Sequence, residues 1–409
     1  MRRSCKDIDL RNYKTLLPWV QDCIRRHHKR FDFRAMLKHY GISRKIYSRV
    51  LLKHDYSLFT EAAEKIAKEA AKRISEHDLS LPPIKLHWRQ DPSSGKMRRI
   101  GSEAAMQQIF DSIAVHASEE IWLRRIVYQQ VSSIKGRGTL HGAKMIQRWV
   151  RSDNRAKRYA RAHSLSYASK CSYFVKTDVA QCYQSARVEI FMELIRRDCN
   201  NGDLLWLWEA LLRSHRVEDY QGFMIGANVS QWAMQYMLSF AYRYIMNLAT
   251  ERRGKRMQMV THALLQMDDM LMISGNRKNL KSAVRKFVRF MKDKLELTIK
   301  PDWHIKVLNV EPIDMMGYVI HCNGKMTIRS RVFIRGRRMV LRCHRKRVLT
   351  IEQARRLSSY KGYFKHTNIW YVKEHKNSDE KIDVKTACDY AASVVSRYDR
   401  EALYDSGTL

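Results

Sequence analysis

The sequence predicts an α+β fold in which short strands lie among many helices. Ala, Glu and Lys are abundant within Tyr56–Ile74 and no helix breaker interrupts them, so this stretch is expected to be helical. Tyr173–Val179 is a run of β-branched and aromatic residues, typical of a buried strand. Two apolar runs, 263–265 and 270–273, flank an acidic pair and predict two strands joined by a turn.

The composition indicates a polyanionic partner. The chain has 409 residues and a formal net charge of +36, because 77 Lys and Arg outnumber 41 Asp and Glu along its whole length. A fold this basic repels itself unless a polyanion lies near, so nucleic acid is the first expected partner. A basic membrane-surface protein is the alternative, but no long apolar amphipathic anchor and no 18-residue apolar run occur, so no membrane partner is predicted. Eight cysteines without a CxxC pair, and no apolar stretch after Met1, predict a cytoplasmic protein.

The first part of the chain is predicted to be a helical N-terminal region over residues 1–85. Leu81-Pro82-Pro83 ends the helical pattern, because proline removes a backbone donor and fixes φ. The elements expected next are an extended piece at 84–88, a turn at 91–95, a return strand at 96–100 and helices at 102–125 and 140–152.

The second half is predicted to alternate helices and strands before a basic end. After the strand at 173–179, the expected elements are helices within 188–213 and over 227–249, the two strands around the acidic pair, a helix at 277–295, and strands near 297–299, at 314–320 and at 325–334. The remaining residues are basic and largely helical in pattern. Between Lys325 and Arg347 basic residues alternate with apolar ones, so one face is expected to pack while the other meets phosphates.

Three carboxylates lie at strand ends: Asp178, Asp268 and Asp269. Two adjacent charges inside an apolar hairpin are costly unless a cation compensates them, although a solvated turn is the ordinary alternative. Mg²⁺ prefers such oxygen ligands, and nucleotidyl transfer uses two divalent ions about 4 Å apart. The pattern therefore favours a site for two Mg²⁺ ions, with Mn²⁺ as a substitute.

Five segments in order resemble the motifs of reverse transcriptases. Lys176–Tyr183 resembles motif A, with an aspartate, four further residues and an aromatic one, and Ile225–Gln231 resembles motif B in its Ser-Gln form. Gln266–Asp269 resembles motif C, Leu297–Pro301 resembles motif D, and Met315–Tyr318 resembles motif E. Together they cover roughly residues 95–320.

The resemblance implies a right-hand polymerase. Fingers and a palm with an antiparallel sheet are expected over 86–320 and a basic helical thumb over 321–409, after the helical block at 1–85. The expected activity is RNA-directed DNA synthesis, with an RNA template, dNTPs and a cDNA product. Ser358–Asn368 is similar to the thumb helix of bacterial reverse transcriptases of the diversity-generating and "unknown group" types.

The resemblance also implies roles for individual residues. The expected metal ligands are Asp178, Val179, Asp268 and Asp269, the three aspartates being catalytic. The expected dNTP-binding residues are Lys96, Arg98, Arg99, Tyr183 and Gln231. The expected template and primer contacts are Arg137, Gly226, Ser230, Gln266, Lys300, Gly317, Tyr318, Arg335 and Arg337.

Two of these positions carry specific expectations. Tyr183 would be a steric gate, its ring filling the space of a ribose 2′-hydroxyl, with a plain core aromatic as the alternative. Gln266 stands where motif C usually has Tyr. Since an amide can hydrogen-bond but cannot stack like a ring, primer handling is expected to differ while metal binding is not.

Two cellular roles remain open. One is anti-phage defence in the bacterial cytoplasm, with a dedicated noncoding RNA as template, and the other is a diversity-generating retroelement. The helical block at 1–85 is longer than expected for the second role and favours defence. A non-catalytic RNA-binding protein is the alternative of another class, and a second copy or an accessory protein stays open as a further partner.

Overall fold

The computed structural model describes residues 3–90, 95–216, 222–252, 254–346, 348–374 and 380–405. Its chain divides into two units that are described separately here. Unit 1 comprises Met1–Ile134, Val175–Met272 and Arg277–Ile305, and unit 2 comprises Lys135–Phe174, Ile273–Asn276 and Lys306–Leu409. The boundaries at 85 and 320, and the arrangement as fingers, palm and thumb, stay predictions.

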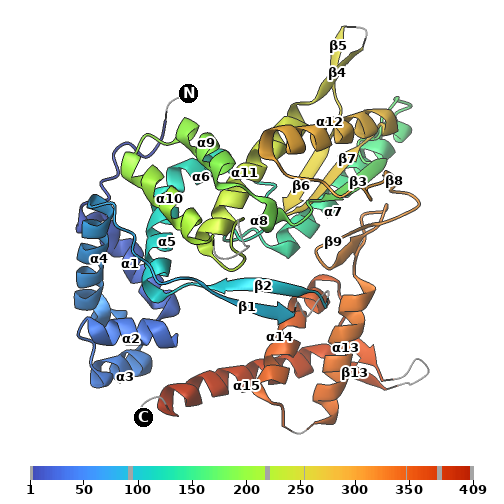
Figure 1. The fold of residues 1–409 in the computed structure, drawn as a ribbon. Helices are drawn as coiled ribbons and strands as arrows, with labels where there is room; N and C mark the ends of the chain where they lie inside the picture. Colours follow the sequence, from blue (N-terminus) through green and yellow to red (C-terminus); the bar gives the residue numbers. More distant parts are fainter. Residues whose placement is uncertain are drawn as a thin grey trace. The chain divides into compact units, whose positions relative to one another are not determined.

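The N-terminal block is helical, as predicted, and appears in blue in Figure 1. It contains α1 (Tyr13–His27), α2 (Phe31–His39), α3 (Arg44–Lys53), the 3₁₀ turn η1 (Tyr56–Phe59) and α4 (Thr60–Ser75). Five buried alanines of α4, at 62, 63, 67, 70 and 71, leave room for neighbouring helices such as α1 to pack closely. Helices α1 and α3 begin where they do because the Asn12 and Ser43 side chains accept hydrogen bonds from main-chain N–H groups in their first turns.

An antiparallel hairpin follows, as the sequence predicts. Strands β1 (Lys85–Gln90) and β2 (Met97–Ser102) pair from Lys85 with Ser102 to Gln90 with Met97. Of the turn predicted at 91–95, residues 91–94 lie outside the described residues, and Gly95 has φ +75°. Next come α5 (Ala105–Ala117) and α6 (Glu119–Arg125), in place of one helix over 102–125.

Aromatic side chains build the interior where the helices of unit 1 meet. Helix α6, which carries Trp122, meets α9 (Val188–Asp198), α10 (Gly202–Ser214) and α11 (Asn228–Asn247) there. The short helix α8 (Cys182–Ser185) precedes α9. Trp208 and Tyr236 are fully buried, and the Trp122 ring lies 5.6 Å from Trp208 and 5.7 Å from Tyr236, centroid to centroid. Beneath them the Tyr236 hydroxyl donates to Asp198, which also pairs with Arg125. The buried charge is therefore compensated.

A four-stranded sheet of short strands carries the acidic residues. The sheet order is β6 (His262–Gln266), β7 (Asp269–Ser274), β3 (Tyr173–Asp178) and β8 (Lys306–Val307), and the chain passes between units inside β3 and β7. Helix α12 (Arg277–Leu295) follows as predicted, and α11 packs on both β6 and α12. The strand predicted near 297–299 is wrong, because among the described residues this segment forms an isolated bridge between Ile299 and Val179 and no regular strand. A separate hairpin joins β4 (Ala249–Arg252) and β5 (Lys255–Gln258).

Unit 2 combines helices with two small antiparallel sheets. Its elements are α7 (Thr139–Ala162), β9 (Ile313–Met315), β10 (Tyr318–Ile320), β11 (Met326–Ile328), α13 (Ser330–Arg345), α14 (Ile351–His366), β12 (Tyr371–Lys373), β13 (Lys381–Asp383) and α15 (Val384–Asp405). The strand predicted over 325–334 ends at Ile328, and α13 begins at Ser330. The reason is helical spacing, since Gly336, Val340 and Cys343 recur every three or four residues on the buried face of α13.

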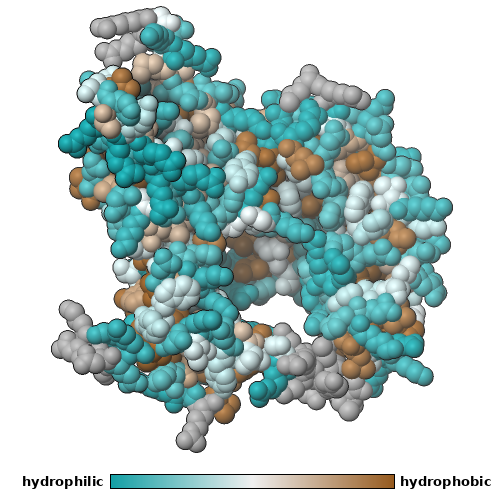
Figure 2. Space-filling view, turned by 180° about the vertical axis from the view of Figure 1, so that it is seen from behind, coloured by the Kyte–Doolittle hydropathy of each residue, from teal (hydrophilic) through white to brown (hydrophobic). Residues whose placement is uncertain are grey.

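The predicted mixture of helices and small antiparallel sheets is thus confirmed. Within the residues that the structure describes, no helix is both long and apolar enough to cross a membrane. Figure 2 shows hydrophilic residues over most of one face, with hydrophobic residues scattered in small groups.

Candidate active site

The three carboxylates lie together in unit 1 because main-chain pairing brings their segments side by side. Asp178 is the last residue of β3, Asp269 is the first of β7, and Asp268 lies in the turn between β6 and β7. β7 neighbours β3 in the sheet, and the Val179 N–H donates to the Asp268 carbonyl at 3.3 Å. The proximity predicted for the motif A and motif C aspartates is therefore present.

The Gln235 side chain contacts the acidic turn and is itself held by Gln130 and Ser132. Met267 has φ +53°, a left-handed conformation that a non-glycine residue adopts at a cost. The Gln235 amide donates to the Met267 sulfur at 3.2 Å and to the Ser132 carbonyl at 2.9 Å. Gln130 in turn donates to the Gln235 side-chain oxygen at 2.7 Å. Gln130 and Gln235 were not predicted from the sequence. Their polar side chains within otherwise apolar segments were the only sequence feature that could have indicated their role.

The carboxylates of the cluster carry like charges and are partly buried, and both conditions raise pKa values. Burial, and then the negative charge of Asp178, raise the pKa of Asp268, while the cations Arg98 and Lys300 lower it. Burial, and then the charges of Asp268 and Asp178, raise the pKa of Asp269 to about 6. Ionisation of Asp268 and Asp269 is therefore costly without added positive charge.

The two carboxylate oxygens of Asp178 indicate where positive charge could bind. One carboxylate oxygen accepts from the Lys300 ammonium at 2.5 Å, and this pairing raises the pKa of Lys300. The other oxygen, Oδ1, is buried and has no hydrogen-bond partner among the described residues. An orphaned carboxylate oxygen beside two further carboxylates fits a hard divalent cation such as Mg²⁺ or Mn²⁺. Asp178, Asp268, Asp269 and the Val179 carbonyl are the groups that could hold it.

Tyr183 lies beside this turn. The residue before its helix α8, Gln181, has φ +46°, so the chain turns sharply after β3. The Tyr183 hydroxyl approaches the Met267 sulfur at 3.6 Å, and its carbonyl accepts from the Phe223 N–H at 2.7 Å. The half-buried ring is thus held next to the acidic turn.

The segment that resembles motif B is tied to the β1–β2 hairpin. The Gly101 N–H donates to the Ile225 carbonyl at 2.9 Å. Gly226 has φ +111°, and a Cβ there would lie 2.9 Å from the Gly101 carbonyl oxygen, so glycine is required for both reasons. Ser230 is buried, whereas Gln231 in the first turn of α11 donates to the Ser133 hydroxyl.

The three cations predicted to bind dNTP have different surroundings. Arg98 is exposed and lowers the pKa of Asp268, so its charge reaches the acidic cluster. The Arg99 guanidinium lies 5.8 Å from the centroid of the Trp88 ring, on the paired strand. Lys96 is exposed just before β2. Gln266 ends β6 half-buried, directly before the acidic turn.

Five predicted template or primer contacts belong to unit 2: Arg137, Gly317, Tyr318, Arg335 and Arg337. Met316 and Gly317, at φ +59° and +81°, form the tight turn between β9 and β10. The Tyr318 ring packs 4.9 Å from Tyr363 of α14.

The three arginines of this set differ in their contacts. Arg337 donates to the Lys373 carbonyl at 2.7 Å and thereby fastens β12 to α13. Arg335 is exposed on α13, and Arg137 is half-buried before α7. Nucleic-acid contacts of these residues stay predictions.

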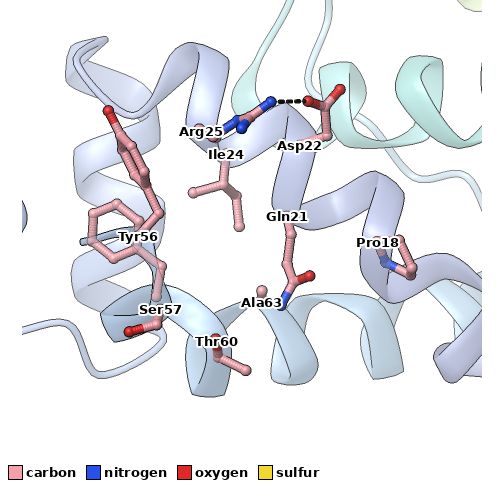
Figure 3. A pocket seen from close by; sticks show the side chains of 10 residues that line it. Pro18, Gln21, Asp22, Ile24, Arg25, Tyr56, Ser57, Thr60 and Ala63 are labelled. Carbon is pink, nitrogen blue, oxygen red and sulfur yellow. Dashed lines mark hydrogen bonds and ion pairs between the residues drawn. The ribbon is translucent and has the colours of Figure 1, made fainter. Parts of the chain in front are cut away.

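A cavity of about 430 Å³ lies elsewhere in unit 1, between α1 and the η1–α4 segment (Figure 3). Its wall includes Gln21, Tyr56 and Thr60, and its charged residues Asp22 and Arg25 form an ion pair. Because those charges already neutralise each other, the cavity offers less for phosphate chemistry than the acidic cluster.

No protein-family model and no curated protein matches the chain. Among solved structures it is similar to telomerase from Candida albicans with a TWJ fragment of telomeric RNA, at 11% identity and a TM-score of 0.39, over 80% of this chain and 60% of that one. It is similar to telomerase from Candida tropicalis with such a fragment, at 10% identity and a TM-score of 0.40, over 85% and 63%. Apo telomerase from Candida tropicalis, truncated from its C-terminal domain, is similar at 12% identity and a TM-score of 0.41, over 67% and 68%.

The chain therefore spans about three fifths of the length of the first two telomerases. With TM-scores below 0.5, these likenesses support no conclusion about activity. The function of this chain has to be argued from its own residues.

The Gly226 geometry leads to a stability prediction. Gly226→Ala should lower the free energy of unfolding by about 1–2 kcal/mol for the left-handed backbone and about 1–3 kcal/mol more for crowding against Gly101. Gly254→Ala is the matched control, since Gly254 has φ +70° but no atom within 4 Å of an added Cβ. Denaturant unfolding followed by tryptophan fluorescence measures both. Equal losses in the two variants would contradict the close approach of Gly226 to β2.

Proposed function

We propose that the chain is an RNA-directed DNA polymerase that makes cDNA from an RNA template and dNTPs by two-metal nucleotidyl transfer. The observation that carries the proposal is the Asp178, Asp268 and Asp269 cluster, in which the orphaned Asp178 Oδ1 faces a site short of positive charge. Such a cluster suits two Mg²⁺ or Mn²⁺ ions better than it suits a folding role, because like charges held side by side repel each other unless a cation is bound.

Each group at the site has a proposed task. When bound, the ions would acidify the primer 3′-hydroxyl and neutralise the triphosphate and the leaving pyrophosphate. Asp178, Asp268, Asp269 and the Val179 carbonyl would hold them. Arg98, whose charge already reaches Asp268, would meet the triphosphate together with Lys96 and Arg99. Tyr183, held beside Met267, would exclude a 2′-hydroxyl.

Lys300 has a distinct place in this scheme. It resembles a motif D residue predicted to touch template or primer, yet its ammonium pairs with Asp178. We assign it the task of a counter-ion that limits repulsion before a metal ion binds. Gly226, Ser230 and Gln231 would then shape the pocket for the nascent base pair.

The net charge of +36 supports a nucleic-acid partner held through phosphates. An RNA–DNA hybrid is near A-form, so contacts with its backbone should dominate over base reading. For the cellular role we propose anti-phage defence in a bacterial cytoplasm, with a dedicated noncoding RNA as template, and a homo-oligomer or accessory protein as further partner. The alternative is a diversity-generating retroelement.

Primer extension tests the activity. The purified chain should extend a DNA or RNA primer on an RNA template with Mg²⁺ or Mn²⁺, and EDTA should abolish synthesis. Asp269→Asn should lower the rate about 10³-fold or more, since a metal ligand contributes several kcal/mol to the transition state. Asp293→Asn, on exposed α12 surface, is the control and should keep full activity.

Failure of this experiment has a clear form. If neither supplied RNA nor RNA that copurifies with the chain yields DNA, the polymerase proposal is wrong. Retention of RNA binding in that case, with Asp269→Asn unchanged in cells, would favour a non-catalytic RNA-binding protein.

Tyr183 provides a separate prediction about sugar selection. Tyr183→Val should increase incorporation of ribonucleotides relative to deoxyribonucleotides at least tenfold, because the space of the ring becomes available to a 2′-hydroxyl. Tyr183→Phe, which keeps the ring but loses the hydroxyl near Met267, should retain discrimination. The ratio of kcat/KM for dNTP and rNTP measures the effect. Equal discrimination in all three proteins would remove the gate role.

A further inference from the structure

Three polar side chains meet in the interior of unit 1, apart from the acidic turn. Glu103 follows β2, Asp111 belongs to α5, and His215 follows α10. The side chains of His215 and Glu103 are 0% and 1% exposed, and Asp111 is 0% exposed. One donor atom from each lies within 4.8 Å of those of the other two, and His215 Nε2 is 3.3 Å from Glu103 Oε1.

The atoms that do not face the cluster centre are already satisfied. His215 Nδ1 lies 3.3 Å from the Ser230 hydroxyl, and Asp111 Oδ2 accepts from the Val229 N–H at 3.1 Å. Apart from the 3.3 Å ion-pair contact between His215 Nε2 and Glu103 Oε1, four atoms make no hydrogen bond among the described residues: Glu103 Oε1, Glu103 Oε2, Asp111 Oδ1 and His215 Nε2. Ser230 and Val229 thus orient the imidazole and the carboxylate, as outer partners of metal ligands do.

We propose that Glu103, Asp111 and His215 form a structural site for one divalent cation of the Zn²⁺ class, separate from the polymerase ions. An imidazole nitrogen with two carboxylates suits Zn²⁺ when a water completes the four ligands, whereas Mg²⁺ prefers all-oxygen sites that keep several waters. Tetrahedral bonds of about 2.0–2.1 Å place neighbouring ligand atoms about 3.3–3.4 Å apart, and the 3.3 Å between His215 Nε2 and Glu103 Oε1 fits this edge.

Charge balance supports the same assignment. Two carboxylates and one divalent cation sum to zero, which removes the cost of isolated buried charge. Because all three side chains are buried, an uncompensated charge here would be costly, and the two carboxylates need either protons or a cation.

The place of this site in the fold suggests its purpose. The cation would join the end of β2, helix α5, the segment after α10 and the first turn of α11, from which Val229 and Ser230 reach the ligands. Gln231, the predicted dNTP contact, is the next residue. The site would therefore hold the motif B segment in place against the β1–β2 hairpin.

Metal retention tests the site on the whole chain. After treatment with EDTA, the protein is incubated with ZnCl₂ in millimolar Mg²⁺, desalted and analysed for zinc. The wild type should retain one Zn²⁺ per chain, and Glu103→Gln and His215→Gln should retain less than about a tenth as much.

Two variants serve as matched controls and should keep one Zn²⁺. Asp269→Asn changes the polymerase site, and Asp153→Asn changes a buried carboxylate whose oxygens accept from Tyr167, Ser169 and the Lys170 N–H. Equal retention in all variants, or none in the wild type, would overturn the proposal. In the second case a shared proton, not a cation, joins Glu103 to Asp111.

A spectroscopic measurement on the wild type avoids any doubt about folding of the variants. Co²⁺ added to the metal-free protein should give the intense visible absorption of a four-coordinate site with nitrogen and oxygen ligands, and Zn²⁺ should remove it. Only the weak absorption of six-coordinate Co²⁺, or a strong near-ultraviolet band from cysteine thiolates, would contradict the assigned ligands. If zinc does not bind in these tests, the zinc-site proposal fails but the polymerase proposal does not, because primer extension tests the polymerase proposal separately.

Discussion

Repulsion among Asp178, Asp268 and Asp269 is the constraint on which the rest of the candidate site depends. The main chain forces these carboxylates together, because the β6–β7 turn hydrogen-bonds to the residue after Asp178. The turn itself contains a left-handed methionine and is held by Gln235 and Gln130. A fold that maintains such an arrangement needs a positive partner, and Lys300 supplies one charge where the proposed chemistry requires four from two ions.

The surrounding structure of unit 1 keeps this cluster in position. Aromatic packing around Trp208 and Tyr236 anchors α11, whose Gln235 reaches the turn. The same helix begins at Val229 and Ser230, which orient the buried Glu103, Asp111 and His215 group. One helix therefore connects two groups of carboxylates for which we propose cations, the partly exposed group at the acidic turn and the fully buried group around His215.

Local sequence patterns predicted much of the fold and the centre of the site. The N-terminal helices, the 84–100 hairpin strands, β3 and α12 follow from short-range periodicity, and they are confirmed. The prediction of a strand near 297–299 was wrong because a single bridge to Val179 replaces regular strand pairing. The prediction that a strand continues over 330–334 was wrong because the apolar residues there recur with helical spacing. Expected roles in nucleic-acid binding stay predictions.

The features that sequence reasoning missed depend on contacts between distant segments. Glu103 and His215 are 112 positions apart and meet only after α5, α10 and α11 pack. Gln130 and Gln235 are joined across a similar separation. No local sequence pattern identifies such residues. Glu103 and His215 are distinguished by buried atoms that make no hydrogen bond among the described residues, and Gln130 and Gln235 by their hydrogen bond to each other.

Anomalous scattering from Mn²⁺, measured on crystals with an RNA–DNA primer–template and a nonreactive dNTP analogue, tests the central claim most directly. The account predicts two manganese peaks about 4 Å apart between Asp178, Asp268 and Asp269, one of them bonded to Asp178 Oδ1, with Lys300 moved off Asp178. A bound primer–template with no manganese at these carboxylates, and with Lys300 still paired to Asp178, would contradict it.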